Sequence, residues 1–313
     1  MDFEIITPFG KTDRLSEGNT VLALGTFDGV HIAHRALFSR AKELKEKLGG
    51  ALAGAWCFSD APASYLKKES TPLLTPLDEK ISLMLNSGLD FVAVGRFENF
   101  CNMEAEDFVK DILISRLGCT AAVCGFNHRF GRGASGDPML LAKLLGGDRV
   151  VTVDEIKYRG TSVSSSAIRR LITSGEIEDA NAMLGRPYSL SAPVVEGKKL
   201  GRRLNFPTAN QFFPKLTLPP KSGIYATVCI IDGKRYVGVS NVGIRPTITD
   251  GTDSHVFNCE TYIVDFDGDI YGQSLTVEFH KRLRDEMRFP SVDELRSQIK
   301  KDTSAAINYF GDR

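Results

Sequence analysis

Two histidines in the segment GTFDGVHIAH, residues 25–34, are the clearest candidates for chemistry in this sequence. His31 and His34 stand three residues apart at the start of a predicted helix, so both imidazoles can face one point. Gly25 and Gly29 allow the preceding turn to approach a ligand or to adopt a positive φ. The helix N-terminus adds free N–H groups and a partial positive charge. This combination predicts a phosphate site in which the imidazoles stabilise charge on an α-phosphate; the alternative is a tight turn with two surface histidines.

A second polar segment, VCGFNHRFGRGASGD at residues 123–137, also follows a predicted strand. Asn127 offers both a donor and an acceptor, and Arg129 can meet a phosphate. The glycines spell GxGxxG, but the dinucleotide fingerprint belongs in the first strand–helix turn of a sheet, and this segment comes late. We therefore predict a mobile loop over a nucleotide, with a glycine-rich surface loop as the alternative.

A third candidate is the serine-rich segment SSSAIRR, residues 164–170. Serine hydroxyls that precede a helix are N-caps by default. The functional interpretation is that Ser165, Ser166 and Arg169 bind a triphosphate from the side opposite the histidines. Helix capping is the simpler explanation for the serines taken alone.

A basic run with two glycines, GKKLGRRLNFPTAN, occupies residues 197–210. Its lysines and arginines can bind phosphate, and the lack of interleaved aromatic residues argues against a nucleic-acid patch. Thr208 and Asn210 provide oxygen ligands of the kind that Mg²⁺ accepts. We predict a phosphate-binding loop with a magnesium site, against the alternative of a solvated basic loop. The phosphate-binding candidates in this run are Gly197, Lys199, Gly201, Arg202 and Pro207.

Glu260 lies in a largely apolar, strand-like stretch, CETYIVDFDGDIYG. A charged residue at an inward strand position is unusual unless it is paired or functional. A carboxylate at such a position can act as a general base that takes the proton from a primary alcohol. The alternative is an outward-facing strand glutamate.

The elements that position these residues fall into two halves. In the first half, strand-like runs such as TVLALGT, ALAGAWCF, DFVAVG, TAAVCGF and RVVTVDE alternate with helical ones, which is typical of an α/β domain with a doubly wound parallel sheet. Ligands of such sheets bind at the carboxyl ends of the strands, where the first three motifs are expected. In the second half, strand-like runs follow one another closely and only SVDELRSQIKKD is helical, with Ser291 as its N-cap, so we expect a small antiparallel β-barrel with a terminal helix. The predicted domains are residues 1–184 and 185–313, because Pro187 resists continuing the preceding helix.

The composition fits two ordinary globular domains, since 42% of the 313 residues are hydrophobic and 25% are charged. Lys plus Arg and Asp plus Glu both number 39, so we expect no global attraction to nucleic acid or to an anionic membrane. The beginning of the sequence has no apolar signal segment, and no run approaches the about 18 apolar residues of a spanning helix. The six cysteines are scattered without a CxxC pair, which favours reduced thiols and a cytoplasmic location over disulfides or a zinc site.

The first half resembles the nucleotidyltransferase superfamily with an HxGH signature, and more closely the FAD synthetase module of prokaryotic bifunctional riboflavin kinase/FAD synthetases. That family has a GxFDGxHxGH start, a later G-x-[DN]-x-x-FG loop and an SSxxIR element, and all three occur here in order. The resemblance implies a Rossmann-like domain that transfers an adenylyl group from ATP to FMN, with His31 and His34 as catalytic residues. It implies contacts with ATP for Gly25, Phe27, Asp28, Gly29, Asn127, Arg129, Ser165, Ser166 and Arg169.

The second half resembles the riboflavin kinase module of the same family. The sequences LGRRLNFPTAN, GIYAT, NVGIRPT and ETYIVDFDGDIYG match the family pattern in order. The resemblance implies that Thr208 and Asn210 bind Mg²⁺–ATP and that Glu260 activates the 5′-hydroxyl of riboflavin. The segment LRDEMRF matches the flavin-side stretch of the family, which implies flavin contacts for Arg284, Glu286 and Phe289.

We therefore expect a bifunctional enzyme that converts riboflavin to FMN and FMN to FAD, with ATP as co-substrate and Mg²⁺ as cofactor. Two departures motivate an alternative, a monofunctional riboflavin kinase with a weakened adenylyltransferase domain. Ala33 replaces the glycine of HxGH, and Ala61 stands where the family has a histidine. A flavin-binding regulator without turnover is a further alternative, against which the intact kinase motifs argue. Riboflavin, FMN and ATP are the expected partners, with no nucleic acid and no membrane.

Overall fold

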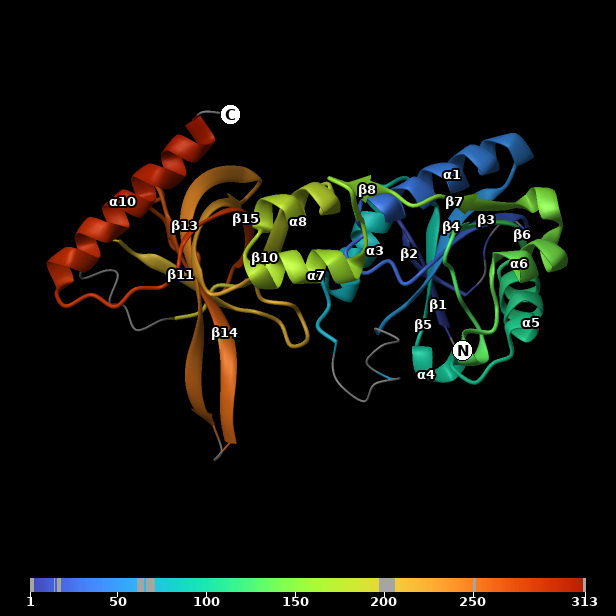
Figure 1. The fold of residues 1–313 in the computed structure, drawn as a ribbon, viewed down its shortest axis with the longest axis horizontal. Helices are drawn as coiled ribbons and strands as arrows, with labels where there is room; N and C mark the ends of the chain where they lie inside the picture. The colour runs from blue at the N-terminus through green and yellow to red at the C-terminus, as the bar shows by residue number, and fades with distance from the viewer. Residues whose placement is uncertain are drawn as a thin grey trace. The chain divides into compact units, whose positions relative to one another are not determined.

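The computed structural model describes residues 3–13, 15, 18–60, 65, 71–196, 206–249 and 252–311. Internal contacts divide the chain into two compact units, one that ends at Ser165 and one that begins at Ser166. Figure 1 shows a sheet covered by helices in the first unit and an antiparallel sheet with a long terminal helix in the second. Each unit is described by itself below.

The first unit is built on a seven-stranded sheet with the order β2-β1-β5-β4-β3-β6-β7. Strands β3 to β7 are parallel, whereas β1 pairs antiparallel with β5 and β2 antiparallel with β1. The strands are β1 (Phe3–Thr7), β2 (Gly10–Thr12), β3 (Thr20–Leu24), β4 (Leu52–Phe58), β5 (Phe91–Gly95), β6 (Cys119–Gly125) and β7 (Val150–Val153). The predicted parallel sheet is confirmed, and the N-terminal hairpin β1–β2 extends it at one edge.

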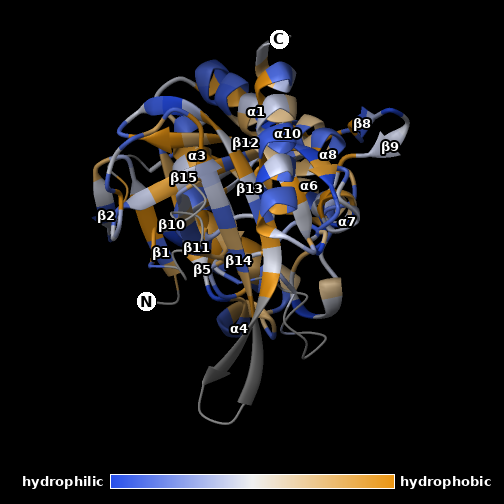
Figure 2. Ribbon diagram, turned by 90° about the vertical axis from the view of Figure 1, so that its left-hand side faces the viewer, coloured by the Kyte–Doolittle hydropathy of each residue, from blue (hydrophilic) through white to orange (hydrophobic). Residues whose placement is uncertain are grey.

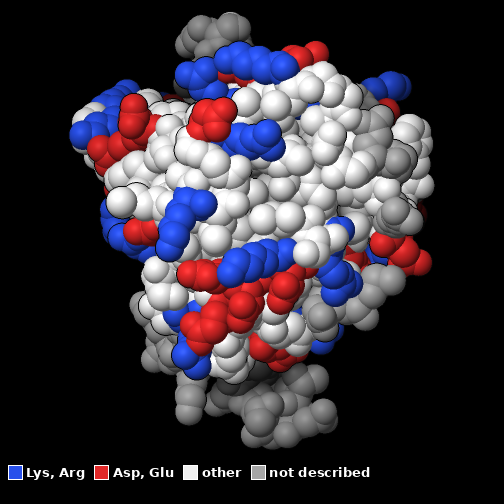
Figure 3. All heavy atoms as spheres, turned by 90° about the vertical axis from the view of Figure 1, so that its right-hand side faces the viewer, with Lys and Arg blue, Asp and Glu red and all other residues white. Residues whose placement is uncertain are grey.

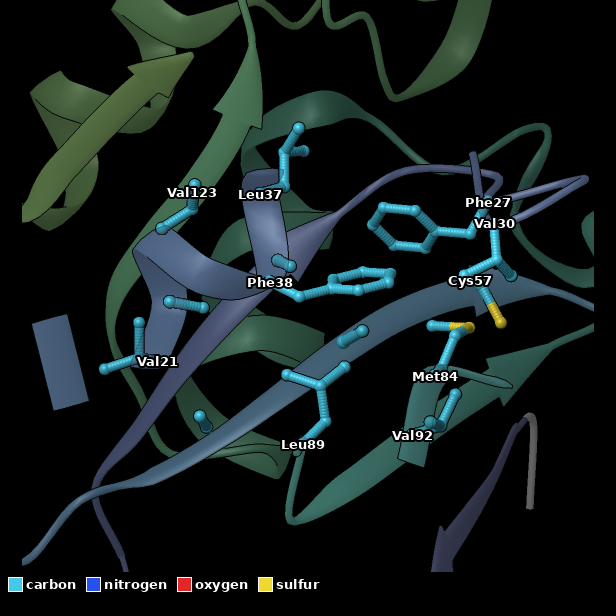
Figure 4. Packing of buried hydrophobic residues seen from close by; sticks show 14 of the residues in the cluster. Val21, Phe27, Val30, Leu37, Phe38, Cys57, Met84, Leu89, Val92 and Val123 are labelled. Carbon is cyan, nitrogen blue, oxygen red and sulfur yellow. The ribbon is translucent and has the colours of Figure 1, made fainter. Parts of the chain in front are cut away.

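Helices cover both faces of this sheet, and alternate residues of the central strand show why. Val21 and Ala23 of β3 pack into the apolar cluster under α1 and α3, which Figure 4 shows, whereas Leu22 and Leu24 pack into the cluster under η1 and α6. A strand buried on both faces is almost entirely apolar, and β3 (TVLAL) is buried at every position and apolar after its first residue, Thr20. The helices are α1 (Ile32–Leu48), α3 (Leu77–Asn86), α4 (Phe97–Phe100), α5 (Ala105–Asp107), the π-helix η1 (Phe108–Arg116) and α6 (Pro138–Leu145).

The π-helix η1 lies between the strand-like runs DFVAVG and TAAVCGF, where the alternating pattern of the sequence indicates a helix. The hydroxyl of Ser115 donates to the carbonyl of Lys110, five residues earlier, at 2.6 Å, which fits the wider π turn. Short elements complete the unit: η2 (Arg132–Ala134), η3 (Gly147–Arg149), β8 (Lys157–Tyr158) and β9 (Thr161–Ser162).

The order of the strands places a topological switch point beside β3. The chain leaves β3 toward β4 on one side, and β6 lies on the other side of β3, with Leu24 opposite Cys124. Open α/β sheets bind ligands in the crevice that this divergence leaves at the carboxyl ends of the strands. The histidine motif follows β3 and the Asn127 motif follows β6, so both lie at the carboxyl ends of these adjacent strands.

The second unit is a six-stranded antiparallel sheet with the order β10-β15-β12-β13-β14-β11. Its outer strands meet through a bridge in which the N–H of Val195 donates to the carbonyl of Asn210 at 2.8 Å, so the sheet curls into a partly closed barrel. The elements are α7 (Ser165–Ser174), α8 (Ile177–Leu184), β10 (Tyr188–Pro193), β11 (Thr208–Phe212), β12 (Gly223–Ile231), β13 (Lys234–Thr249), β14 (Thr252–Ile263), β15 (Ser274–Arg284) and α10 (Val292–Gly311).

The terminal helix α10 packs its apolar side on the barrel. Ala306 lies in one cluster with Ile224 and Ala226 of β12 and Val239 of β13, and the helix carries both hydrophilic and hydrophobic residues in Figure 2. The N–H of Glu294 donates to the hydroxyl of Ser291 at 3.2 Å, which confirms the predicted N-cap. The predicted barrel with a terminal helix is confirmed, although β11 falls in a stretch that the sequence analysis assigned to a loop.

Candidate active sites

A strained loop between β3 and α1 carries the first site. Phe27 and Val30 adopt positive φ values of 54° and 42°. Such a conformation costs a non-glycine residue about 1–3 kcal/mol and persists only where the surrounding structure holds it. Both are fully buried, and the Phe27 ring packs 4.9 Å from Phe38 and 5.1 Å from His34. A Cβ at Gly25 would lie 2.9 Å from the Phe27 ring, which accounts for this glycine. Phe27 therefore supports the loop from the core side, and its predicted contact with ATP stays a prediction.

The two histidines form one stacked pair at the beginning of α1. Their ring centroids are 3.5 Å apart with an interplanar angle of 19°. His31 is the N-cap, and its Nδ1 accepts the N–H of His34 at 3.3 Å. Because Nδ1 is an acceptor, the neutral ring of His31 carries its proton on Nε2. The two imidazoles therefore lie together at the beginning of α1, and their predicted contact with a phosphate stays a prediction.

His34 is held in its neutral form. Burial, the neighbouring His31 and the ammonium of Lys80 hold the pKa of His34 well below its usual value. Its Nδ1 is buried and has no hydrogen-bond partner among the residues that the structure describes. A neutral imidazole can donate one hydrogen bond to a phosphate oxygen, and a bound anion would favour its protonation.

Asp28 fastens the loop to a distant segment. Its Oδ1 accepts the N–H groups of Leu74 at 3.0 Å and Thr75 at 3.3 Å, and its Oδ2 lies 3.2 Å from the Leu74 nitrogen. Its main-chain carbonyl accepts the hydroxyl of Ser165 at 2.8 Å. Asp28 is 6% exposed and its carboxylate positions the loop, while its predicted contact with ATP stays a prediction. Gly29 follows at a φ of 87°.

Lys80 is a buried lysine near the histidine loop that the sequence analysis did not single out. It is 4% exposed, and its Nζ donates to the carbonyl of Phe58 at 2.6 Å and lies 3.5 Å from that of Thr26. These carbonyls stand at the carboxyl end of β4 and just after β3, so the ammonium ties the two strand ends together. A signal was present, because Lys80 interrupts the apolar stripe of Leu77, Ile81 and Met84 on α3.

The loop after β6 is folded back on itself. Phe130 and Gly136 pair in a bridge, and Arg129 forms an ion pair with Asp137 at 3.3 Å. Asn127 is exposed just past the end of β6, beside the strand that leads to the histidines. Ser165 joins the same unit through Asp28, whereas Ser166 and Arg169 open the second unit, and their predicted contact with the triphosphate stays a prediction.

Three polar side chains form a row across the second unit. Asn210 of β11 pairs in register with Glu260 of β14, and Glu260 pairs with Asn241 of β13. Directly opposed residues of an antiparallel sheet point to the same face. The strand neighbours Cys259 and Thr261 are fully buried on the other face. The apolar neighbours of Glu260 had suggested that it points into the barrel interior, but it lies on the opposite face.

The amide oxygens of the two asparagines in this row have no hydrogen-bond donor among the described residues. The Oδ1 atoms of Asn210 and Asn241 are buried and unpaired among the described residues, and the Nδ2 of Asn258 donates to Glu260 Oε1 at 3.0 Å. Asn210 is 5% exposed and its Nδ2 lies 3.3 Å from the carbonyl of Thr208. The unpaired Oδ1 of Asn210, the hydroxyl of Thr208 on the same strand and the carboxylate of Glu260 are oxygen ligands of the kind that a hard cation such as Mg²⁺ takes. Pro207, which directly precedes Thr208, is exposed. Gly197, Lys199, Gly201 and Arg202 lie outside the described residues.

Comparisons with known proteins match both units. Residues 13–167 match the family model for FAD synthetase, and residues 184–310 match the model for riboflavin kinase. The bifunctional riboflavin kinase/FMN adenylyltransferase of Bacillus subtilis (strain 168) is 34% identical over 298 residues, which cover 94% of this chain and 93% of the relative. That of Escherichia coli (strain K12) is 34% identical over 313 residues, 98% of each chain. The chain belongs to the bifunctional riboflavin kinase/FMN adenylyltransferase family.

Membership of this family confirms the predicted bifunctional enzyme, with a kinase and an adenylyltransferase module in one chain. A crystal structure described as a macrolide-efflux protein from Streptococcus pneumoniae is also similar, with a TM-score of 0.85 and 27% identity over 95% of this chain and 96% of that one. In the part of the chain that the structure describes, no helix is long and apolar enough to cross a membrane.

The residues expected to contact the flavin make contacts within the second unit, and their flavin contacts stay a prediction. Arg284 at the end of β15 forms a paired ion contact with Asp302 of α10, at 3.0 Å from Nε to Oδ1 and 2.7 Å from Nη2 to Oδ2, and its guanidinium lies 5.9 Å from the Phe289 ring. Glu286 is exposed and lies over the backbone of Gly243 in β13. Arg284 therefore anchors the segment 284–289 to α10, and Glu286 brings the segment to β13.

Proposed function

We propose that adenylyl transfer to FMN takes place at the crevice beside β3, in a domain of residues 1–184. The observation that carries this proposal is the stacked pair of His31 and His34 at the helix N-terminus of the switch point. Donors at such a place favour the negative charge of a triphosphate. The backbone of Gly25 and Gly29, together with Asn127, Arg129, Ser165, Ser166 and Arg169, would complete the contacts with ATP.

In this step a phosphate oxygen of FMN attacks the α-phosphorus of ATP. A new P–O–P bond forms while the bond to the β-phosphate breaks, and pyrophosphate leaves. The FMN phosphate is already an anion, so no general base is needed. His31 Nε2–H and the neutral His34 donate hydrogen bonds to oxygens whose charge grows in the transition state, which electrostatic preorganisation rewards. Asp28 and Lys80 contact the loop that presents them, Asp28 from within it and Lys80 at the carbonyl of Thr26.

We propose that riboflavin phosphorylation takes place at the polar row of the second domain, residues 185–313. Glu260 takes the proton of the 5′-hydroxyl, the oxygen attacks the γ-phosphorus of ATP, and ADP leaves. Thr208 and Asn210 would hold Mg²⁺, which neutralises charge on the phosphates of ATP. Support comes from the unpaired Oδ1 of Asn210 beside Glu260 in register. The basic run of Gly197, Lys199, Gly201, Arg202 and Pro207 would bind the phosphates.

We further propose that the enzyme works in the cytoplasm with riboflavin, FMN and ATP as its partners. All six cysteines are free thiols, which suits a reducing compartment. On the face drawn in Figure 3, acidic and basic side chains lie beside one another. A nucleic acid would meet both signs of charge on that face.

The test is separation of flavins by chromatography after incubation of the full chain with ATP and Mg²⁺. One sample contains riboflavin and the other FMN. We expect FMN to form in the first and FAD in the second. FMN formation without any FAD formation would contradict the adenylyltransferase assignment and favour a monofunctional kinase, the alternative that Ala33 and Ala61 motivate. Absence of ATP consumption in both samples would favour a flavin-binding regulator.

A further inference from the structure

The two ends of the row of Asn210, Glu260 and Asn241 have different neighbours. Asn210 and Asn241 flank Glu260 on its two neighbouring strands, each about 5 Å away between Cα atoms, as is usual for opposed residues. The β11 side carries Thr208 and Asn210, the proposed ligands of Mg²⁺–ATP. The β13 side carries Asn241 and, two residues further along the same strand, Gly243.

The flavin-side segment reaches the β13 side of the row. A Cβ at Gly243 would lie 2.8 Å from Oε1 of Glu286, so the Glu286 carboxylate lies directly over this part of β13. The helix α10, to which Arg284 is anchored through Asp302, packs on β12 and β13. If ATP binds at β11 and the flavin ring near segment 284–289, the ribityl chain of the flavin runs past Asn241 to Glu260.

Asn241 presents an acceptor that no described residue uses. Its Oδ1 is buried and without a hydrogen-bond donor among the described residues. A buried unpaired carbonyl oxygen is costly to the folded protein, and a hydroxyl donor from a ligand would remove that cost. The ribityl chain of riboflavin carries several hydroxyls next to the 5′-hydroxyl, so it brings donors of the required kind to this place.

We propose that Asn241 is a specificity-determining residue of the kinase, whose Oδ1 accepts a hydrogen bond from a ribityl hydroxyl beside the 5′-hydroxyl that Glu260 activates. The proposal rests on the proposed function of the second domain. It assigns recognition of the polyol chain to β13, separate from binding of the isoalloxazine ring. Asn241 thereby helps the kinase to distinguish a flavin with a ribityl chain from one without it.

The test compares two flavins in the full-length protein. Riboflavin carries the ribityl chain, whereas lumiflavin has a methyl group in its place, and binding of each is followed by flavin fluorescence with Asn241→Ala and Asn241→Ser. We expect Asn241→Ala to weaken riboflavin binding about tenfold, the equivalent of one hydrogen bond, and to leave lumiflavin binding unchanged. The hydroxyl of Asn241→Ser should restore part of the loss.

Kinetics separate this proposal from its rivals. We expect the KM for riboflavin to rise in Asn241→Ala, with the KM for ATP and the Mg²⁺ requirement unchanged. A raised Mg²⁺ requirement would overturn the proposal and make Asn241 a metal ligand instead. An equal loss for riboflavin and lumiflavin would overturn it as well, since that indicates a structural role. If the unchanged protein formed no FMN at all, the proposed function itself would fail, which is a distinct outcome.

Discussion

The Asp28 carboxylate offers a sharp test of how the histidine loop is held. Its oxygens make three contacts with two N–H donors, those of Leu74 and Thr75. Asn at position 28 keeps one acceptor oxygen and turns an NH₂ group toward the donors. The remaining Oδ1 can still accept both N–H groups, so the change removes the negative charge and replaces the second Leu74 contact, at 3.2 Å, by an NH₂ group. Hydrogen bonds to a charged group exceed neutral ones by about 1 kcal/mol each, so we expect Asp28→Asn to destabilise the first unit by about 2 kcal/mol.

The single tryptophan makes the assay specific to this unit. Trp56 lies in β4, 3% exposed, so its fluorescence during urea unfolding reports on the sheet of the first unit. The matched control is Asp148→Asn, which makes the same chemical change at an exposed position and should shift stability by less than about 0.5 kcal/mol. We also expect Asp28→Asn to slow FAD formation and to spare FMN formation. An Asp28→Asn protein as stable as the control would refute the role of the carboxylate in holding the loop.

Three further changes probe the first unit. Lys80→Met should release the carbonyls of Phe58 and Thr26 and should raise the pKa of His34, which NMR titration measures. It should also lower FAD formation at least tenfold and leave FMN formation intact. An unchanged His34 pKa would contradict this prediction. Ala33→Gly should speed FAD formation if the methyl crowds a phosphate, and unchanged turnover would show that the methyl is harmless. Burial lowers the pKa of His128 from 6.5 to about 4, so only the unfolded chain takes up this proton between those values, and stability should fall as the pH drops below 6.5. At pH 5 the loss is up to about 2 kcal/mol, and it should be absent in His128→Asn; urea unfolding at pH 7 and pH 5 measures it.

The sequence was most informative where a polar motif directly follows an apolar run. TVLAL is apolar at four of its five positions, which predicted a strand covered on both faces, with the histidines at its carboxyl end. The closely spaced strand-like runs of the second half likewise predicted an antiparallel barrel with one terminal helix. In these cases local periodicity and tertiary burial agree.

Contacts between distant segments were beyond the sequence. Phe27 belongs to the motif by spacing, but only the packing of Phe38 shows that its ring is core. Apolar neighbours suggested that Glu260 faces inward, yet the twofold alternation of β14 gives that face to Cys259 and Thr261. Arg284 matched a flavin-side segment, and its pairing with Asp302 of α10 depends on two elements meeting in space.

The central claim, that the two reactions occur at two separate sites, is tested most directly by crossing two variants with two substrates. Glu260→Gln and His31→Ala are each incubated with ATP and Mg²⁺, once with riboflavin and once with FMN, and the flavins are separated by chromatography. We expect Glu260→Gln to form no FMN from riboflavin but to make FAD from FMN, and His31→Ala to form FMN but little FAD. Loss of both activities in either folded variant would contradict the assignment of one reaction to each site.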